Sequence, residues 1–276
     1  MATTTKESTT AKAKGTSFRF DATERARFDR EGFIVRERVF DARECAAIAA
    51  ACEALVAELV AARRSTKHVV GSYMFERQEA FGINVKWEPS QPDVVMGLEP
   101  FAHHSKPLND WGYDPRLTDP CKDVIGVDEV VLFTEKINYK RARDGGPIIL
   151  HQDYPYWAAF TPIASRVATA MLFLDDANVE NGCLEVAPGS HREGVQKRWE
   201  TTGLRNREMD DTAFDVKRLI PLEVPGGSVA YFNAFLVHRS LPNRSSHDRR
   251  ALLYSYQPAG NPHAREIPRP FKLTDG

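Results

Sequence analysis

Apolar and polar positions near the start of the chain have the spacing of two helices joined by a short strand. Asp21 suits the N-cap of the first helix, because its carboxylate can accept backbone N–H groups of the first turn, and Gly32 suits the helix end. Residues 33–39 are typical of a strand. Asp41 precedes the longest predicted helix, residues 42–64, where many alanines favour helix formation. One face of this helix carries Ile48, Leu55, Leu59 and Val60.

The second half of the chain consists of short apolar runs separated by turn residues. The turn sequences DGG, ENG, PGS and PGG stand between these runs. The runs predict strands over 130–139, 147–151, 166–174, 183–187, 220–224, 227–232 and 251–256. Many short strands that follow helices at the front of the chain favour a barrel or jelly roll with the helices packed outside.

Between these halves, residues 65–128 carry scattered aromatic residues, prolines and histidines without a clear period. A segment this long and irregular is more often functional than a plain connection, so we predict an insert that covers the substrate. The adjacent His103 and His104 in this insert are more typical of a loop than of a metal site. Residues 1–17, rich in Thr, Lys and Ala, are expected to be a disordered tail, and 18–276 a single domain.

Composition narrows the class of protein. A chain of 276 residues with 42% hydrophobic and 27% charged residues is typical of a soluble globular protein. The 37 basic residues nearly cancel the 38 acidic ones, so no overall field favours binding to nucleic acid or an anionic membrane, and a small-molecule or protein partner is expected. No apolar run has the roughly 18 residues of a membrane span. The four cysteines form no disulfide framework or zinc pattern, which favours reduced thiols and a cytoplasmic location.

The strongest candidate for chemistry is His151-Gln152-Asp153. If this stretch is extended, residues two apart project from the same face, so the imidazole and the carboxylate can meet one ion. The pattern alone is weak, because about one His-x-Asp or His-x-Glu match is expected by chance in a chain of this composition. A second match, His191-Arg192-Glu193, follows a turn and runs into a basic stretch, which favours a surface location.

A third ligand and a basic residue lie downstream. His238 follows an apolar run, and two histidines with one carboxylate form the facial triad that leaves three positions open on non-haem Fe(II). Arg249 or Arg250 can hold the far carboxylate of an organic co-substrate through a bidentate contact. Adjacent residues of a strand face opposite sides, so only one of the two arginines can serve. The basic residues Lys140, Arg141 and Arg143 are expected in a solvated loop, with contact of one of them to an anionic substrate as the alternative.

Three segments carry a family resemblance. HQDYPYW, ENGCLEVAPGSH and the stretch from His238 through HRS to Arg249, eleven residues after that histidine, resemble the phytanoyl-CoA dioxygenase family of Fe(II)- and 2-oxoglutarate-dependent oxygenases. The resemblance runs from about Asp21 to about Tyr256. It implies a β-rich (α+β) fold, a double-stranded β-helix of the jelly-roll, cupin-like kind. It also implies that Fe(II) is bound by the catalytic residues His151, Asp153 and His238, with 2-oxoglutarate and O2 as co-substrates.

The same resemblance implies how the co-substrate is held. Arg249 would bind the distal carboxylate of 2-oxoglutarate, Ser240 would assist it, and Asn138, thirteen residues before His151, would contact the co-substrate. Halogenating relatives carry a small residue in place of the carboxylate, so Asp153 favours hydroxylation. The expected reaction is hydroxylation of an unactivated C–H bond in an amino-acid derivative, an acyl thioester or a natural-product intermediate, with release of succinate and CO2.

The sequence also allows other functions. The same cofactor chemistry can end in desaturation, cyclisation or epimerisation. A non-catalytic jelly-roll binding protein is a second alternative, although it would not need an intact set of ligands. A cupin-like metal isomerase or a zinc hydrolase is a third, but neither would need Arg249 to hold a dicarboxylate. The protein is expected to act as a monomer or homodimer.

Overall fold

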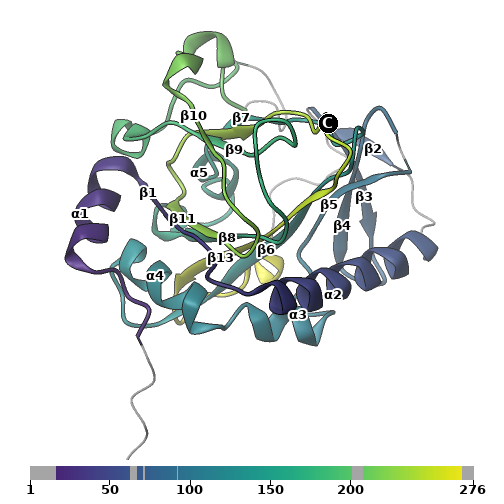
Figure 1. Ribbon diagram of the computed structural model, residues 1–276, viewed down its shortest axis with the longest axis horizontal. Coiled ribbons are helices and arrows are strands. Elements are labelled where there is room, and N and C mark those ends of the chain that lie inside the picture. The colour runs from purple at the N-terminus through teal and green to yellow at the C-terminus, as the bar shows by residue number, and fades with distance from the viewer. Residues whose placement is uncertain (1–16, 63–66, 71, 92, 201–207, 269–276) are drawn as a thin grey trace, which may run out of the picture.

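Two antiparallel sheets form the centre of the molecule (Figure 1). The computed structural model describes residues 17–62, 67–70, 72–91, 93–200 and 208–268. In spatial order, the larger sheet contains β1 (Phe33–Arg36), β11 (Val229–Asn233), β8 (Ala168–Phe173), β13 (Arg249–Pro258), β6 (Val130–Lys140), β5 (Val95–Glu99), β4 (Ile83–Trp87), β3 (Tyr73–Gln78) and β2 (His68–Val70). The smaller sheet contains β10 (Ile220–Leu222), β9 (Leu184–Val186), β12 (His238–Ser240) and β7 (Ile148–His151). The predicted β-rich jelly roll is confirmed.

Short helices accompany the two sheets. The α-helices are α1 (Ala22–Glu31), α2 (Ala42–Ala61), α3 (Lys106–Trp111), α4 (Pro115–Ile125) and α5 (Tyr154–Trp157). Single 3₁₀ turns cover Ala164–Arg166, Ser190–Glu193, Asp211–Ala213, Val216–Arg218 and Ala264–Glu266. As predicted, Asp21 and Asp41 cap α1 and α2. Each accepts the N–H of the glutamate three residues later, whose side chain accepts the N–H of the cap, and this capping box fixes where each helix begins.

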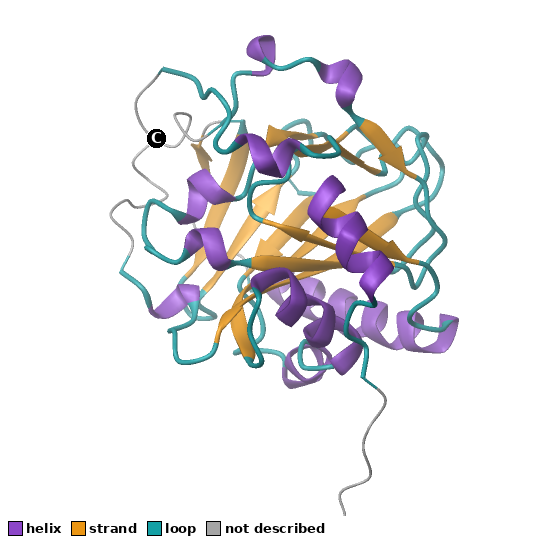
Figure 2. Cartoon of the chain, turned by 90° about the vertical axis from the view of Figure 1, so that its left-hand side faces the viewer, coloured by secondary structure: helices purple, strands orange, loops and turns teal. Residues whose placement is uncertain are grey.

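The N-terminal helices cover the outer face of the larger sheet. In Figures 1 and 2, α2, α3 and α4 lie on one side of this sheet, and the smaller sheet lies over the opposite side. Helix α2 buries Ile48, Leu55 and Leu59 in this outer core, together with Trp87 and Tyr254 from the sheet. A second core of apolar side chains, which includes Phe173 and Val186, lies between the two sheets.

Two details near the front of the chain differ from the sequence-based expectation. Val60 was expected on the buried face of α2 but is 39% exposed. It follows Leu59 by one residue, which turns it about 100° away from the sheet. The strand expected over 33–39 ends at Arg36, because Arg38 adopts a left-handed conformation with φ 49°.

The region 65–128 is more regular than expected. Its described residues form strands β2 to β5, which extend the larger sheet, and helices α3 and α4. The sequence hides these strands because polar side chains such as Lys86 and Glu99 project into a cavity where an apolar alternation would otherwise appear. The predicted tail, apart from Ser17, lies outside the described residues.

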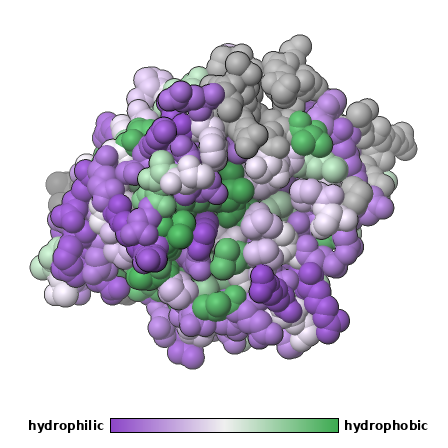
Figure 3. All heavy atoms as spheres, turned by 90° about the horizontal axis from the view of Figure 1, so that it is seen from above, coloured by the Kyte–Doolittle hydropathy of each residue, from purple (hydrophilic) through white to green (hydrophobic). Residues whose placement is uncertain are grey.

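Large exposed apolar side chains are dispersed, and Figure 3 shows polar residues around the apolar ones on the face seen from above. Within the described ranges, no helix is long and apolar enough to cross a membrane. All four cysteines are buried and unpaired, as predicted.

Truncation of neighbouring residues on α2 tests which face of the helix is buried. Leu59→Ala should lower the free energy of unfolding by about 2–5 kcal/mol, because Leu59 is fully packed against the sheet. Val60→Ala should change it by less than about 0.5 kcal/mol, because Val60 is exposed. Urea unfolding monitored by circular dichroism measures both values. Equal losses in the two variants would contradict this packing.

Candidate metal centre

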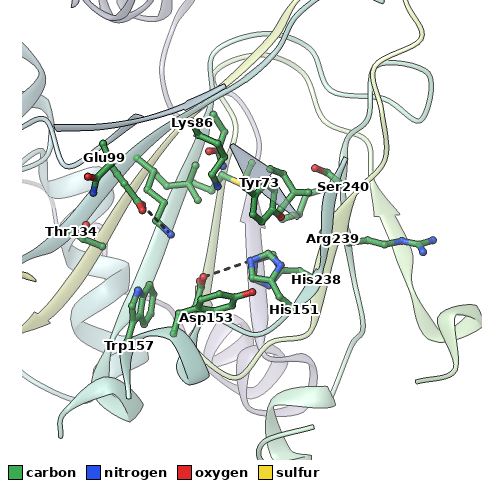
Figure 4. Close-up of a pocket in the computed structure, with 18 of the residues that line it drawn as sticks. Tyr73, Lys86, Glu99, Thr134, His151, Asp153, Trp157, His238, Arg239 and Ser240 are labelled. Carbon is green, nitrogen blue, oxygen red and sulfur yellow. Dashed lines mark ion pairs between the residues drawn. The ribbon is translucent and has the colours of Figure 1, made fainter. Parts of the chain in front are cut away.

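The structure brings together the three side chains predicted as metal ligands. His151 ends β7 and His238 begins β12, and the two residues are cross-strand partners in the smaller sheet. Their ring centroids lie 4.1 Å apart. Nε2 of His151 lies 3.7 Å from Oδ1 of Asp153, and possible ligand atoms of all three residues lie within 4.8 Å of one another (Figure 4). One ion can therefore contact all three side chains.

Each imidazole is oriented by a backbone carbonyl two residues earlier. Nδ1 of His151 lies 2.8 Å from the oxygen of Ile149, and Nδ1 of His238 lies 2.9 Å from that of Leu236. Because Nδ1 donates in both contacts, Nε2 keeps its lone pair for a metal. Burial and the neighbouring His238 lower the pKa of His151, which favours the neutral form that binds metal. Two imidazoles and a carboxylate fit the donor set of non-haem Fe(II).

Asp153 reaches this site through a turn. Strand β7 ends at His151, and Asp153 has φ −70° and ψ −31°, in the helical region, immediately before α5. The expectation that residues 151–153 are extended is therefore wrong. The chain bends after His151, and this bend brings the carboxylate back toward the imidazole.

Gln152 holds this bend from the side away from the ligands. Its side chain is fully buried and does not line the cavity. Its amide Nε2 donates to the carbonyls of Gly194 and Phe235, at 2.9 and 2.6 Å, and its Oε1 accepts the N–H of Gln196 at 2.9 Å. Gln152 thus ties the bend to two other loops, one of which leads directly into His238.

Arg249 lies in the same cavity as the triad. It is only 1% exposed, its Nη2 donates to the carbonyl of Gly182 at 2.6 Å, and its Nε has no partner among the described residues. Gly182 has φ 74°, and a Cβ there would lie 2.2 Å from the oxygen of Leu241, so this close approach requires glycine. Burial lowers the pKa of Arg249 to about 10. A buried guanidinium without a carboxylate in contact fits an organic anion as its partner.

Three further polar residues line the cavity beside Arg249. Lys140 is its cross-strand partner, Asn138 precedes Lys140 by two residues on β6, and Ser240 follows His238 by two residues on β12. Nζ of Lys140 lies 3.4 Å from the backbone oxygen of Ser240. Lys140 is 2% exposed, so its expected place in a solvated loop is wrong. Strand β6 continues through Lys140 and turns its side chain inward.

Arg250 points to the other face of the sheet. Its Nε donates to Asp175 at 2.8 Å, and its Nη1 lies 3.5 Å from Glu53. The alternation expected for the two arginines is therefore present, with Arg249 inward and Arg250 outward. The role of Arg249 toward a co-substrate stays a prediction.

The opposite end of the cavity is aromatic and was not identified from the sequence. Lys136 forms an ion pair with Glu99 at 3.3 Å in this region, and Figure 4 shows Glu99 and Trp157 across the triad from Ser240. Aromatic lining at this end comes from Tyr156, Trp157 and Phe160. Tyr73 and Phe75 of β3, a strand for which the sequence showed no clear period, also line the cavity, and Figure 4 shows Tyr73 close to Ser240.

The remaining histidines considered from the sequence lie outside the cavity lining. His103 and His104 contact the Phe81 carbonyl and Glu58, as expected for a loop next to α2. His191, expected at the surface, is half-buried with its ring 6.2 Å from that of Phe28. It lies there because the 3₁₀ turn that contains it packs against the end of α1.

Comparisons with known proteins agree with the geometry. A family model of phytanoyl-CoA dioxygenase (PhyH) matches residues 28–251. The chain is similar to phytanoyl-CoA dioxygenase domain-containing protein 1 of Danio rerio, with 29% identity over 54% of this chain and 52% of that protein. It is also similar to the 2-aminoethylphosphonate dioxygenase of uncultured bacterium HF130_AEPn_1, with 29% identity over 66% of this chain and 68% of that protein. The chain thus spans about half the length of the first relative.

A solved structure shows the same fold. The crystal structure of EctD from S. alaskensis with 2-oxoglutarate and 5-hydroxyectoine superimposes with a TM-score of 0.70 and 22% sequence identity. The match covers 96% of this chain and 90% of that one. The two chains therefore share the same jelly-roll fold.

Gln152 gives a test of how the bend supports the ligands. Gln152→Ala leaves two buried carbonyls and one N–H without their partner, so the affinity for Fe(II) should fall roughly tenfold. Gln196→Ala is the matched control, because only the backbone of Gln196 contacts Gln152. Anaerobic Fe(II) titration with a competing chelator measures both affinities. An unchanged affinity in Gln152→Ala would show that the bend is fixed without it.

Proposed function

The chain belongs to the phytanoyl-CoA dioxygenase family, and from that premise we propose that it hydroxylates a small molecule in an Fe(II)- and 2-oxoglutarate-dependent reaction. The observation that carries this proposal is the convergence of His151, Asp153 and His238 beside the buried Arg249. A metal triad alone would also suit a hydrolase or an isomerase. The buried guanidinium in the same cavity favours a dicarboxylate co-substrate instead.

Bound iron and its co-substrates would carry out the oxidation, and side chains of the protein would hold them in position. When bound, Fe(II) with O2 and 2-oxoglutarate inserts oxygen into a C–H bond, and 2-oxoglutarate is converted to succinate and CO2. His151, Asp153 and His238 are proposed to hold the metal on one face and leave the other face open for co-substrates. Arg249 is proposed to bind the distal carboxylate, with Ser240 assisting it.

The spacing along the strands suits the length of this co-substrate. His238 and Ser240 lie two residues apart on β12, so their side chains project from the same side at a separation of about 7 Å. A five-carbon dicarboxylate that reaches the metal with one end can thus reach Ser240 and Arg249 with the other. We assign Asn138, on β6 next to the strand that carries Arg249, to the side of the same co-substrate.

The aromatic end of the cavity is proposed to receive the substrate. Trp157 is 4% exposed and packs edge-on against Phe133, which itself stacks on Phe160. A wall of this kind keeps water away from the reacting C–H bond and limits side reactions. Tyr73 lines the cavity and is held in place, because its hydroxyl oxygen accepts the N–H of Ile149 on the opposite sheet at 3.1 Å.

Hydroxylation is the favoured outcome of the reaction. Asp153 occupies the third ligand position, so no metal position is vacated for a halide. Desaturation, cyclisation and epimerisation use the same residues, and product analysis would distinguish them. The relative from the uncultured bacterium is named for 2-aminoethylphosphonate, a small molecule, which supports a substrate of that size here.

We propose that residues 18–276 act as one catalytic domain, since ligands from both halves of the β-rich region share one site. Four unpaired cysteines favour a reducing, cytoplasmic compartment. The near-zero net charge favours neither nucleic acid nor membrane as a partner, and we expect a monomer or homodimer.

Cofactor binding can be followed without knowing the substrate. Anaerobic addition of Fe(II) and 2-oxoglutarate to the protein should give a weak visible charge-transfer band, because the co-substrate chelates the metal. His151→Ala should lose this band, since one of three ligands is removed. His191→Ala is the control and should keep it, because His191 lies outside the cavity. No band in the unchanged protein would refute the assignment of iron and co-substrate.

The two adjacent arginines provide a second test. Arg249→Ala should raise the 2-oxoglutarate concentration needed for half-maximal band formation by roughly 10- to 150-fold, because a charge-assisted contact is lost. Arg250→Ala should leave this concentration within about twofold, since Arg250 pairs with Asp175 outside the cavity. The opposite ranking of the two variants would mean that the co-substrate binds elsewhere.

A further inference from the structure

Four of the five cationic side chains that line the cavity already have an oxygen partner. Lys136 pairs with Glu99, and Arg239 pairs with Glu185. Arg249 donates to Gly182, and Lys140 donates to the carbonyls of Gly146 and Ser240. The fifth is Lys86, for which no hydrogen bond or ion pair with another described residue is found.

The ammonium group of Lys86 lies against the rings of Tyr73 and Phe75. Its Nζ lies 4.2 Å from the ring centroid of Tyr73 and 5.4 Å from that of Phe75. Such contacts stabilise an ammonium ion without using its N–H donors, so Lys86 keeps three donors for a ligand. The hydroxyl oxygen of Tyr73 accepts the N–H of Ile149, and this hydrogen bond fixes the position of the Tyr73 ring.

The strand register places Lys86 on the cavity side of the larger sheet, in the same cross-strand row as Asn138. Lys86 on β4 pairs with Gly97 on β5, and Gly97 pairs with Asn138 on β6. Gly97 has no side chain, so no side chain of β5 separates Lys86 from Asn138 in this cross-strand row of the larger sheet. Figure 4 shows Lys86 beside Tyr73, above the triad and away from Arg239. Strands β6 and β5 lie between Lys86 on β4 and Arg249 on β13, so an acid bound at Lys86 would lie within the cavity but apart from Arg249.

None of the described carboxylates forms an ion pair with Lys86. Burial and, to a smaller extent, the charge of Lys136 lower its pKa to about 8, although Glu99, Glu88 and Asp153 raise it from a distance. A cation in such a place is stabilised when an anion arrives. Asp153 is assigned to the metal, Glu99 pairs with Lys136, and Glu88 accepts the N–H of Gly146, so these three carboxylates already have partners and the anion is expected from a bound ligand.

We propose that Lys86 binds an oxyanion of the substrate, a carboxylate or a phosphonate, and that the enzyme therefore selects small anionic molecules. The aromatic side chains around Lys86 would contact the apolar part of the same molecule. This inference rests on the proposed function, because it assumes that the cavity receives a substrate beside the metal.

Three probes of similar size test this proposal: butyrate, propylphosphonate and the neutral butyramide. Each is added anaerobically to protein saturated with Fe(II) and 2-oxoglutarate, so that Arg249 is already occupied. Paramagnetic relaxation of the probe's protons by Fe(II) reports binding near the metal. At least one of the two acids should show this relaxation, and butyramide should not. The acid that binds identifies the preferred oxyanion.

Variants assign the effect to Lys86. Lys86→Met should weaken binding of the acid roughly tenfold or more, because a charge-assisted contact is lost. Lys86→Arg should retain binding. Lys217→Met makes the same change in net charge at an exposed position and should have no effect. The charge-transfer band in Lys86→Met shows whether its metal site is intact.

The possible failures can be told apart. If the band forms but neither acid binds, or butyramide binds as well as the acids, or Lys86→Met binds the acid normally, this inference is overturned while the proposed function stands. If the unchanged protein gives no band, the proposed function fails. Calorimetric titration of the acids into the metal-free protein and into Lys86→Met then still decides whether Lys86 is an anion site.

Discussion

The structure depends on the cross-strand pairing of His151 with His238. These residues are 87 positions apart in the chain, and a metal ion requires their imidazoles to be within a few ångströms of each other. The antiparallel contact of β7 with β12 satisfies this requirement, and the bend after His151 adds Asp153. The larger sheet then provides the opposite wall of the cavity. Helices α2, α3 and α4 cover the outer face of that sheet, so its inner face is left for ligands.

Charge in this cavity is arranged locally. The chain as a whole has nearly equal numbers of acidic and basic residues, so its net charge cannot attract an anion. Inside the cavity, cations outnumber the acids that contact them, and two of the cations differ in kind. Within the part of the chain that the structure describes, Nε of the fully buried Arg249 is unpaired, whereas Lys86 lies against aromatic rings and its N–H donors have no hydrogen-bond partner. We infer that these two side chains receive two different anions, the co-substrate and the substrate.

Much of the site could be predicted from the sequence, but its surroundings could not. His151, Asp153 and His238 stand in a recognisable pattern, and strand alternation correctly separated Arg249 from Arg250. The same alternation failed for Asp153, because a bend replaces the strand at that point. It also failed for β3 to β5, where inward side chains such as Lys86 are polar because they face a cavity. Hydrophobic periodicity detects burial against a core, so strands that line a polar cavity escape it.

The most direct test of the account is a crystal structure of the protein soaked anaerobically with Fe(II) and 2-oxoglutarate, with anomalous scattering recorded at the iron edge. We expect one strong anomalous peak in contact with Nε2 of His151, Nε2 of His238 and a carboxylate oxygen of Asp153, and 2-oxoglutarate density that extends from this peak to Arg249. An iron peak away from these three residues, or 2-oxoglutarate bound at Arg250, would contradict the account.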